Sequence, residues 1–393
     1  MKKTIKDYDL HGKRVIIRCD FNVPMKDGKI TDDTRIQAAL PTIEYAINES
    51  AKVILMSHLG RVKEEKDLVK NDLFPVAQRL SNLLNQKVLF CKATSGSELK
   101  DAVDGLKDGE VLLMQNTRYE DLNGKKESSN DPELGAFWAS LGDIYINDAF
   151  GTAHRAHASN VGIASHLPNG IGFLIEKELN HLDSLKNPER PYVIIMGGAK
   201  VSDKIKVIEN LAPIADKIMI GGGMAFTFLK AKGIDIGKSL LEEDSLEFCQ
   251  KMIATYGDKL VLPVDVNVTT EFSEETPHHI CKVSEIGADE MAMDIGPETI
   301  AMMKEVLANA KTVFWNGPLG VYEMEEYQKG TNELLKTIAN SSIHSVLGGG
   351  DIVAAASELG FKDKVSHAST GGGATLEFLE GKELPGIAII QEK

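Results

Sequence analysis

Short apolar runs alternate with longer amphipathic stretches along the first half of the chain. The amphipathic stretches at residues 32–50 and 72–84 have a helical period. The apolar runs are rich in Val, Ile and Leu rather than strictly alternating, which favours strands buried on both faces of a parallel sheet. These predicted strands occupy residues 14–21, 51–59, 87–91, 110–116 and 143–150.

The second half repeats this rhythm of apolar and amphipathic segments. Strands are predicted at 191–198, 217–223, 259–268, 311–317 and 344–350. Helices are predicted at 202–211, 224–232, 297–309, 331–340, 352–359 and 374–380. Regular strand–helix alternation is typical of α/β proteins, in which helices cover both faces of parallel sheets.

The chain has 393 residues, which favours two domains of about 150–200 residues over one core. The break is expected near 165–190, where Pro and Gly turns precede a helical segment and the prolines of NPERP end it. We therefore predict a first domain at 1–172, a connecting helix at 173–186 and a second domain at 187–379. The tail at 380–393 carries one apolar run, GIAII, which suits packing on either domain.

Composition excludes several classes of function. A net charge of −14 argues against nucleic acid or an acidic membrane as the main partner. The four cysteines are far apart and form no C-x-x-C pair, which argues against a disulfide framework or a zinc site. No signal peptide or apolar run of about 20 residues is present, so we expect a cytoplasmic protein.

Four Gly-rich segments of the second half follow predicted strands and open predicted helices. They lie at 197–200, 221–224, 348–351 and 370–374. Such junctions present free N–H groups and the positive end of a helix to phosphate. One glycine run alone could be a packing turn, but four in one domain indicate a phosphate cradle. The segment GIDIGKS (233–239) is one residue short of a P-loop and G-x-G-x-x-G is absent, which disfavours Walker-type and NAD enzymes.

Charged residues accompany these glycines. Lys200 and Lys204 would share one face of a helix that begins at 201, where they could bind phosphate or simply be solvated. Asp351 could face Mg²⁺ or cap the following helix. Glu323 could accept hydrogen bonds from ribose hydroxyls or be solvated.

The first half carries basic and polar residues just after its predicted strands. Four arginines and up to three histidines in an acidic protein predict a pocket for a multiply charged anion. His154 and His157 have helical spacing for a metal pair, but no third ligand of fitting spacing is apparent. Neither a G-x-S-x-G elbow nor a nucleophilic Cys motif occurs, so covalent catalysis has no support. The pocket residues are Asp20, Asn22, Arg35, His58, Arg61, Arg118 and Arg155, with His154 and His157 beside them.

These segments together resemble the phosphoglycerate kinase family. The matching stretches include RCDFNVP, SHLGR, DAFGTAHRAHAS, GGAKVSDKI, GGGMAFTFL, WNGPLGVYE, GGGD and STGGGATLEFLEG. They occur in the family's order and cover the chain from about residue 12 to 381. The block DAFGTAHRAHAS is highly specific to this family.

The resemblance implies two Rossmann-like three-layer domains with parallel sheets, joined by a connecting helix and a hinge, with the tail returning to the first domain. It implies a cytoplasmic, monomeric glycolytic enzyme that transfers a phosphoryl group between 1,3-bisphosphoglycerate and ADP, giving 3-phosphoglycerate and ATP. Mg²⁺ would be bound with the nucleotide, and catalysis would proceed by domain closure and charge stabilisation without a covalent intermediate. The alternatives are another two-domain kinase or phosphate-ester enzyme that uses the same phosphate cradles, and a non-catalytic binding or scaffold protein on this fold.

The resemblance also implies residue roles. In the first domain, Asp20 and Asn22 would bind the glycerate end, and Arg35, His58, Arg61, Arg118 and Arg155 its carboxylate and phosphate. In the second, Asp351 would meet the metal. The transferred phosphoryl would face Arg35 of the first domain and, of the second domain, Lys200, Gly371, Gly372 and Gly373. The nucleotide site would include Lys204, Ala292, Asn316, Glu323, Gly348, Gly349, Gly350, Asp351 and Ile352.

Two positions of the nucleotide site depart from the family pattern. Ile352 follows Gly-Gly-Asp where Ser or Thr is usual, so no side-chain hydroxyl is available there. Ala292 stands where many members have Gly near the adenine.

Overall fold

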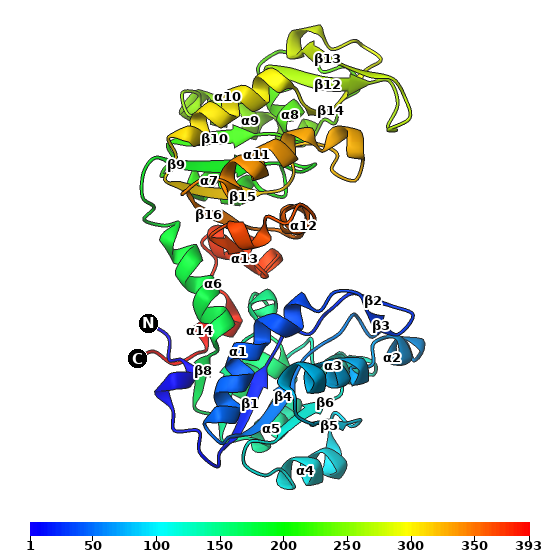
Figure 1. Ribbon diagram of the computed structural model, residues 1–393, viewed down its shortest axis with the longest axis vertical. Coiled ribbons are helices and arrows are strands. Elements are labelled where there is room, and N and C mark those ends of the chain that lie inside the picture. The colour runs from blue at the N-terminus through cyan, green and yellow to red at the C-terminus, as the bar shows by residue number, and fades with distance from the viewer. The chain divides into compact units, whose positions relative to one another are not determined.

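The computed structural model describes residues 1–393, and the chain forms two compact units. Unit 1 comprises Met1–Asn180 and Glu383–Lys393, and unit 2 comprises His181–Lys382. The division falls inside helix α6 (Phe173–Ser184), which therefore contributes to both units (Figure 1). The fold class is α/β, as the sequence predicts. No helix in either unit has both the length and the apolar character that crossing a membrane requires.

Unit 1 is built on a six-stranded parallel sheet in the order β5-β6-β4-β1-β7-β8. The strands follow the predicted apolar runs, except β8, whose three residues include Asn and Gly and carry no apolar signal. Every residue of β6 and β7 is buried, as parallel strands covered on both faces should be. The strands are β1 (Arg14–Arg18), β4 (Lys52–Met56), β5 (Val88–Cys91), β6 (Val111–Met114), β7 (Ile144–Asn147) and β8 (Asn169–Ile171).

Helices and one small hairpin complete this unit. Helices α1 and α3 were predicted, and α1 packs its apolar side on β4 through Ile36 and Ile43. Helix α6 matches the connecting helix predicted at 173–186, whereas α2, α4 and α5 are not among the predicted helices. The elements are α1 (Thr34–Asn48), α2 (Lys66–Lys70), α3 (Phe74–Leu84), α4 (Gly96–Asp104) and α5 (Pro132–Ser140), with a hairpin of β2 (Met25–Lys26) and β3 (Lys29–Ile30).

Unit 2 repeats the design with a parallel sheet in the order β11-β10-β9-β15-β16-β17. All six predicted helices are present, and α9 is an addition. The strands are β9 (Tyr192–Met196), β10 (Lys217–Ile220), β11 (Leu260–Val261), β15 (Thr312–Asn316), β16 (His344–Leu347) and β17 (His367–Ala368). The helices are α7 (Ile205–Leu211), α8 (Met224–Ala231), α9 (Leu246–Tyr256), α10 (Pro297–Ala308), α11 (Lys329–Ala339), α12 (Gly350–Glu358) and α13 (Gly373–Leu379).

A second, antiparallel sheet in unit 2 was not predicted. It has the order β13-β12-β14, with β12 (Asp265–Thr269), β13 (His278–Lys282) and β14 (Met291–Ile295). The prediction of one strand at 259–268 is wrong, because β11 and β12 belong to different sheets. Pro263 lies between them and has no N–H to donate, so a continuous ladder is interrupted there.

Residues 383–393 belong to unit 1 and form its last elements. Helix α14 (Pro385–Ala388) brings the Gly386 carbonyl within 2.9 Å of the Asn147 side-chain amide, which donates to it. The Gly386 N–H donates to the Ala153 carbonyl at 2.8 Å, and Lys2 donates to the Ile390 carbonyl at 2.8 Å. The two Gly386 contacts lie at the end of β7 and in the loop after it, so the tail supports the edge of the sheet that carries the candidate residues.

Candidate active site

In unit 1 the candidate residues lie in the segments that follow four neighbouring strands, at one edge of the sheet. The strands β6, β4, β1 and β7 are adjacent and parallel, so their carboxyl ends lie side by side. Carboxyl ends of parallel strands are where ligands of open α/β sheets bind. The residues that follow are Arg118 after β6, His58 and Arg61 after β4, Asp20 and Asn22 after β1, and Arg155 after β7.

Three of the predicted arginines line one cavity of about 760 Å³. Arg61, Arg118 and Arg155 come from three different loops and share this cavity with Lys63 and Lys125. The two lysines were not predicted, because each stands in a polar loop without a motif around it. Five cationic side chains and few acidic ones make the cavity suitable for a multiply charged anion.

Arg35, Asp20 and Asn22 do not line this cavity, but hydrogen bonds link them to one another and to Gly60, the residue before Arg61. Arg35, at the start of α1, makes an ion pair with Asp20. The Asn22 side-chain oxygen accepts from the Gly60 N–H at 2.8 Å, and Arg118 donates to the Gly60 carbonyl. The structure therefore links Arg35, Asp20, Asn22 and Arg118 into one region of unit 1.

Two of the histidines expected beside this pocket, His58 and His157, do not add positive charge to it. Burial, together with the charges of Arg18, Arg118 and Arg35, holds the pKa of His58 well below its usual range. Burial and the same kind of repulsion lower the pKa of His157 to about 3. Both imidazoles are therefore neutral near pH 7, and the cationic side chains that line the cavity are arginines and lysines.

A buried ionic network behind these residues was missed from the sequence. The Arg18 guanidinium donates to the Ser159 hydroxyl at 2.9 Å, and the Ser159 N–H donates to Glu127 at 2.9 Å. Arg18 also lies 3.3 Å from the His58 ring nitrogen Nδ1. The available signal was Arg18 itself, a charged residue that directly follows the apolar run Val15–Ile17.

In unit 2 the glycine-rich loops likewise follow neighbouring parallel strands, at one edge of the sheet. The strands β10, β9, β15, β16 and β17 are adjacent, parallel and followed by loops rich in Gly. The loops after β9 and β10 form part of one cavity of about 390 Å³, through Gly198, Ala199, Gly222 and Gly223. Among the predicted nucleotide residues, Ala292, Glu323 and Asp351 line this cavity.

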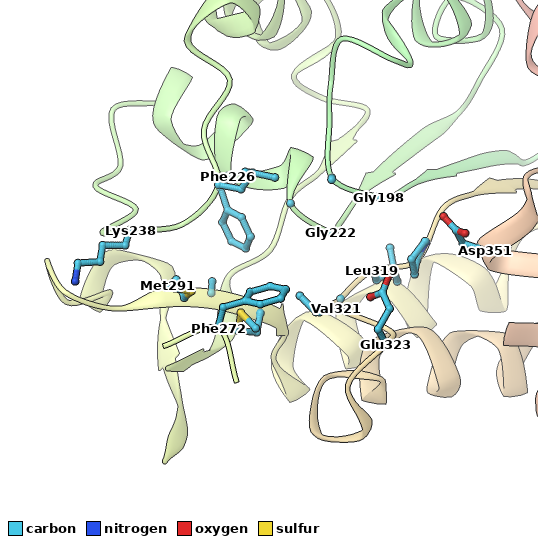
Figure 2. Close-up of a pocket in the computed structure, with 17 residues that line it drawn as sticks. Gly198, Gly222, Phe226, Lys238, Phe272, Met291, Leu319, Val321, Glu323 and Asp351 are labelled. Carbon is cyan, nitrogen blue, oxygen red and sulfur yellow. The ribbon is translucent and has the colours of Figure 1, made fainter. Parts of the chain in front are cut away.

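The cavity has a polar end and an apolar end. Figure 2 shows the carboxylates of Glu323 and Asp351 towards one end and the side chains of Phe226, Phe272 and Met291 towards the other. None of these three apolar residues is among the predicted site residues: Phe272 and Met291 stand in no motif, and Phe226 lies in GGGMAFTFL, where only the glycines have a predicted role. An apolar recess joined to a polar, glycine-lined end fits a molecule with a flat base and a charged tail.

The predicted pairing of Lys200 and Lys204 on one helix face is wrong. Helix α7 begins only at Ile205, and Lys204 is the residue before it. Lys204 is buried and donates to Asn316, whereas Lys200 is exposed in the loop. Burial lowers the pKa of Lys204 to about 8, and the Asp351 carboxylate opposes this shift.

Asn316 joins Lys204 to the glycines of the next loop. Its side-chain amide donates to the Gly348 carbonyl. Gly349 has φ +108°, and a Cβ there would lie 2.6 Å from the Asn316 amide nitrogen, so only glycine fits. The Ile352 side chain is buried in the core of unit 2, which leaves only its main-chain atoms for a ligand.

The remaining predicted catalytic residues of unit 2 lie outside the cavity. Lys200 is exposed after β9, and Gly371–Gly373 follow β17 at the start of α13. The Gly371 N–H donates to the Ser369 hydroxyl at 3.1 Å.

Comparison with known proteins agrees with this arrangement. The family model described as phosphoglycerate kinase matches residues 5–382. Proteins named phosphoglycerate kinase from Listeria welshimeri and Enterococcus faecalis are 59% and 58% identical to the chain, with complete coverage of both chains in each case.

The chain belongs to the phosphoglycerate kinase family. The glycolytic exchange of a phosphoryl group between 1,3-bisphosphoglycerate and ADP, giving 3-phosphoglycerate and ATP, is the activity that goes with this membership, and the chain is a kinase.

Solved structures of phosphoglycerate kinases share the fold. The enzyme from Coxiella burnetii aligns with a TM-score of 0.89 at 42% identity, covering 99% of this chain and 98% of the other. The enzyme from Pyrococcus horikoshii aligns with a TM-score of 0.84 at 34% identity, with the same coverage. Two Rossmann-like domains are therefore common to this chain and to phosphoglycerate kinases.

Proposed function

We propose that the arginine-lined cavity of unit 1 binds 3-phosphoglycerate or 1,3-bisphosphoglycerate. The observation that carries this proposal is the convergence of Arg61, Arg118 and Arg155 from three loops at one sheet edge. Guanidinium groups bind carboxylate and phosphate through paired hydrogen bonds. Arg35, His58, Asp20 and Asn22 lie in the loops and helix around the cavity and would complete the substrate site.

We propose that the cavity of unit 2 binds ADP or ATP. The base would occupy the apolar end beside Ala292, Glu323 would bind the ribose, and the phosphates would lie against the glycine loops. Lys204 and Asn316, bonded to each other beside Gly348–Gly350, are the proposed phosphate contacts. The main chain at Ile352 would extend this contact at the start of α12.

The residues present fit a magnesium ion bound together with nucleotide. Mg²⁺ is usually held by one or two carboxylates and by substrate phosphates. Asp351 is exposed at the start of α12, lines the cavity and is close enough to Lys204 to influence its pKa. We propose that Asp351 holds Mg²⁺, which would neutralise phosphate charge when bound.

The proposed chemistry needs neither a protein base nor a covalent intermediate. The leaving carboxylate of an acyl phosphate departs readily, so catalysis consists of positioning and charge neutralisation. Arg35, Lys200 and the N–H groups of Gly371–Gly373 are the proposed contacts of the transferred phosphoryl group. Because Arg35 belongs to unit 1 and the others to unit 2, we propose that the units close on their ligands through a hinge at α6.

A coupled assay with 3-phosphoglycerate and ATP tests the substrate assignment. Arg118→Ala should raise KM for 3-phosphoglycerate at least tenfold while KM for ATP changes little, because one charged hydrogen-bond donor is lost. Arg14→Ala is a matched control, since Arg14 pairs with Asp143 at the opposite end of β1. Equal effects of the two variants, or better activity with acetate or a sugar, would contradict the assignment.

Two measurements test closure and assembly. Small-angle scattering should show compaction only when both ligands are bound, and an unchanged profile would count against the hinge. We propose a monomer, as the resemblance to phosphoglycerate kinases implies. Light scattering during size exclusion that gives twice the chain mass would refute it.

A further inference from the structure

The outer strand of the antiparallel sheet in unit 2 carries a histidine and a cysteine on the same face. In β13, His279 and Cys281 are two residues apart, and side chains two apart in a strand point to one side. They pair with Val268 and Val266 of β12, whose side chains belong to the small core beneath this sheet. Cys281 packs against that core, while His279 is exposed.

Glu290, immediately before β14, brings a carboxylate to the same place. One potential ligand atom from each of His279, Cys281 and Glu290 lies within 4.8 Å of the other two. His279 Nε2 and Glu290 Oε1 are 3.5 Å apart. That separation is longer than a charged hydrogen bond, and it is close to the roughly 3.4 Å between N and O ligands of one tetrahedral zinc ion.

We propose that His279, Cys281 and Glu290 form a binding site for a divalent cation of the zinc type, with a fourth position open to solvent. Imidazole, thiolate and carboxylate are the three ligand types that Zn²⁺ uses in proteins. A thiolate among the ligands favours Zn²⁺ over Mg²⁺, which prefers oxygen alone. The site is therefore chemically distinct from the oxygen ligand proposed at Asp351.

The surroundings of the three ligands suit this role. The second carboxylate oxygen of Glu290 accepts from the Gly287 N–H at 2.8 Å, which holds the first oxygen towards His279.

The site adjoins the candidate nucleotide cavity through the main chain. The Lys238 N–H donates to the Glu290 carbonyl at 2.7 Å, and Lys238 and Met291 both line that cavity. None of the three ligands lines it, so substitutions at the site leave the proposed catalytic residues in place.

Titration of the untagged, nucleotide-free protein with Co²⁺ tests the proposal. We expect binding of one ion with the absorption band of a thiolate-to-cobalt charge transfer, and displacement by Zn²⁺. Cys281→Ser should abolish the band, and His279→Ala and Glu290→Gln should weaken Co²⁺ affinity about tenfold or more. His278→Ala is the matched control, because His278 is the neighbouring exposed histidine on the other side of the strand.

Several outcomes would overturn the site. They are a wild-type protein without the thiolate band, a band that survives Cys281→Ser, or equal losses for His278→Ala and His279→Ala. Circular dichroism and basal kinase activity should be the same in all variants. If Cys281→Ser fails to fold, His279→Ala decides the question, because an exposed imidazole can be removed without disturbing the core.

Discussion

The ionisation of individual charged residues in this protein depends on their surroundings. Lys200 and Lys204 are four positions apart, yet one is exposed and the other is buried against Asn316. Burial makes the charged form of Lys204 costly, and its pKa falls to about 8. Two lysines of one motif therefore have different ionisation behaviour, and we expect them to have different functions.

Nucleotide affinity should depend on pH through Lys204. In the free protein this side chain loses its proton as pH rises through about 8, and phosphates attract only the protonated form. Between about pH 7 and about pH 9 the Kd for ADP should rise by up to about tenfold. Calorimetry on the wild type and on Lys204→Arg measures this. The same slope in the variant, which stays charged, would contradict the role of Lys204.

Lys200 should act on the rate rather than on binding. Lys200→Ala is expected to lower kcat by roughly 10²–10³ with little change in KM, because a contact made mainly in the transition state is lost. Lys206→Ala provides the matched control, since Lys206 is also exposed and lies nearby on α7. An unchanged kcat in Lys200→Ala would remove Lys200 from the proposed mechanism.

At the scale of helices and strands, α6 begins on a buried carboxylate. Asp148, just after β7, accepts from the Leu174 N–H at 3.0 Å and thereby satisfies the first turn of α6. Burial raises the pKa of Asp148 to about 7, even though this hydrogen bond favours the charged form. The start of the helix shared by the two units thus depends on a group that titrates near neutrality.

Asp148→Asn should change how stability depends on pH. The folded wild type holds this proton up to about pH 7, whereas the unfolded chain loses it near 3.8. The contribution of Asp148 to the free energy of unfolding is therefore greatest below 3.8 and falls as pH rises through 7. Denaturant unfolding at about pH 5 and about pH 8 should show a smaller decrease in the asparagine variant. An identical decrease would indicate that Asp148 is ionised throughout.

The helices and strands that the sequence predicts are those whose pattern of apolar residues extends over several positions. The strands that follow Val/Ile/Leu runs, such as β4 and β9, appear where expected, as do the loops after them. Strand β8 and the antiparallel sheet escape prediction, because β8 has three residues and β13 is polar and mostly exposed. Loop residues with a motif could be identified, but Phe272, Lys63 and Lys125 reach their cavities only through the tertiary fold.

On the scale of the whole molecule, the chain completes unit 1 with residues that follow unit 2. Leu384, Ile387 and Ile390 are buried in unit 1, and Asn147 donates to the Gly386 carbonyl beside them. This C-terminal segment contacts the end of β7, and Arg155 lies in the loop that follows that strand. The stability of unit 1 and the geometry of its candidate site should therefore both depend on the tail.

Ile390→Ala tests that dependence. Removing this buried side chain should destabilise unit 1 by about 2–4 kcal/mol. Hydrogen exchange should quicken in the strands of unit 1 and stay unchanged in the strands of unit 2. Glu383→Ala, an exposed change in the same segment, should have no effect. Faster exchange in unit 2 alone would contradict the assignment of the tail to unit 1.

The placement of residues 383–393 also bears on how the protein is made. A ribosome must synthesise all of unit 2 before the segment that completes unit 1 emerges. Unit 1 therefore remains incomplete while unit 2 is being synthesised. Unit 2 is contiguous and can reach its final form first. During translation the partly formed unit 1 exposes the apolar surface that the tail later covers, and it is the part of the nascent chain that we expect chaperones to bind.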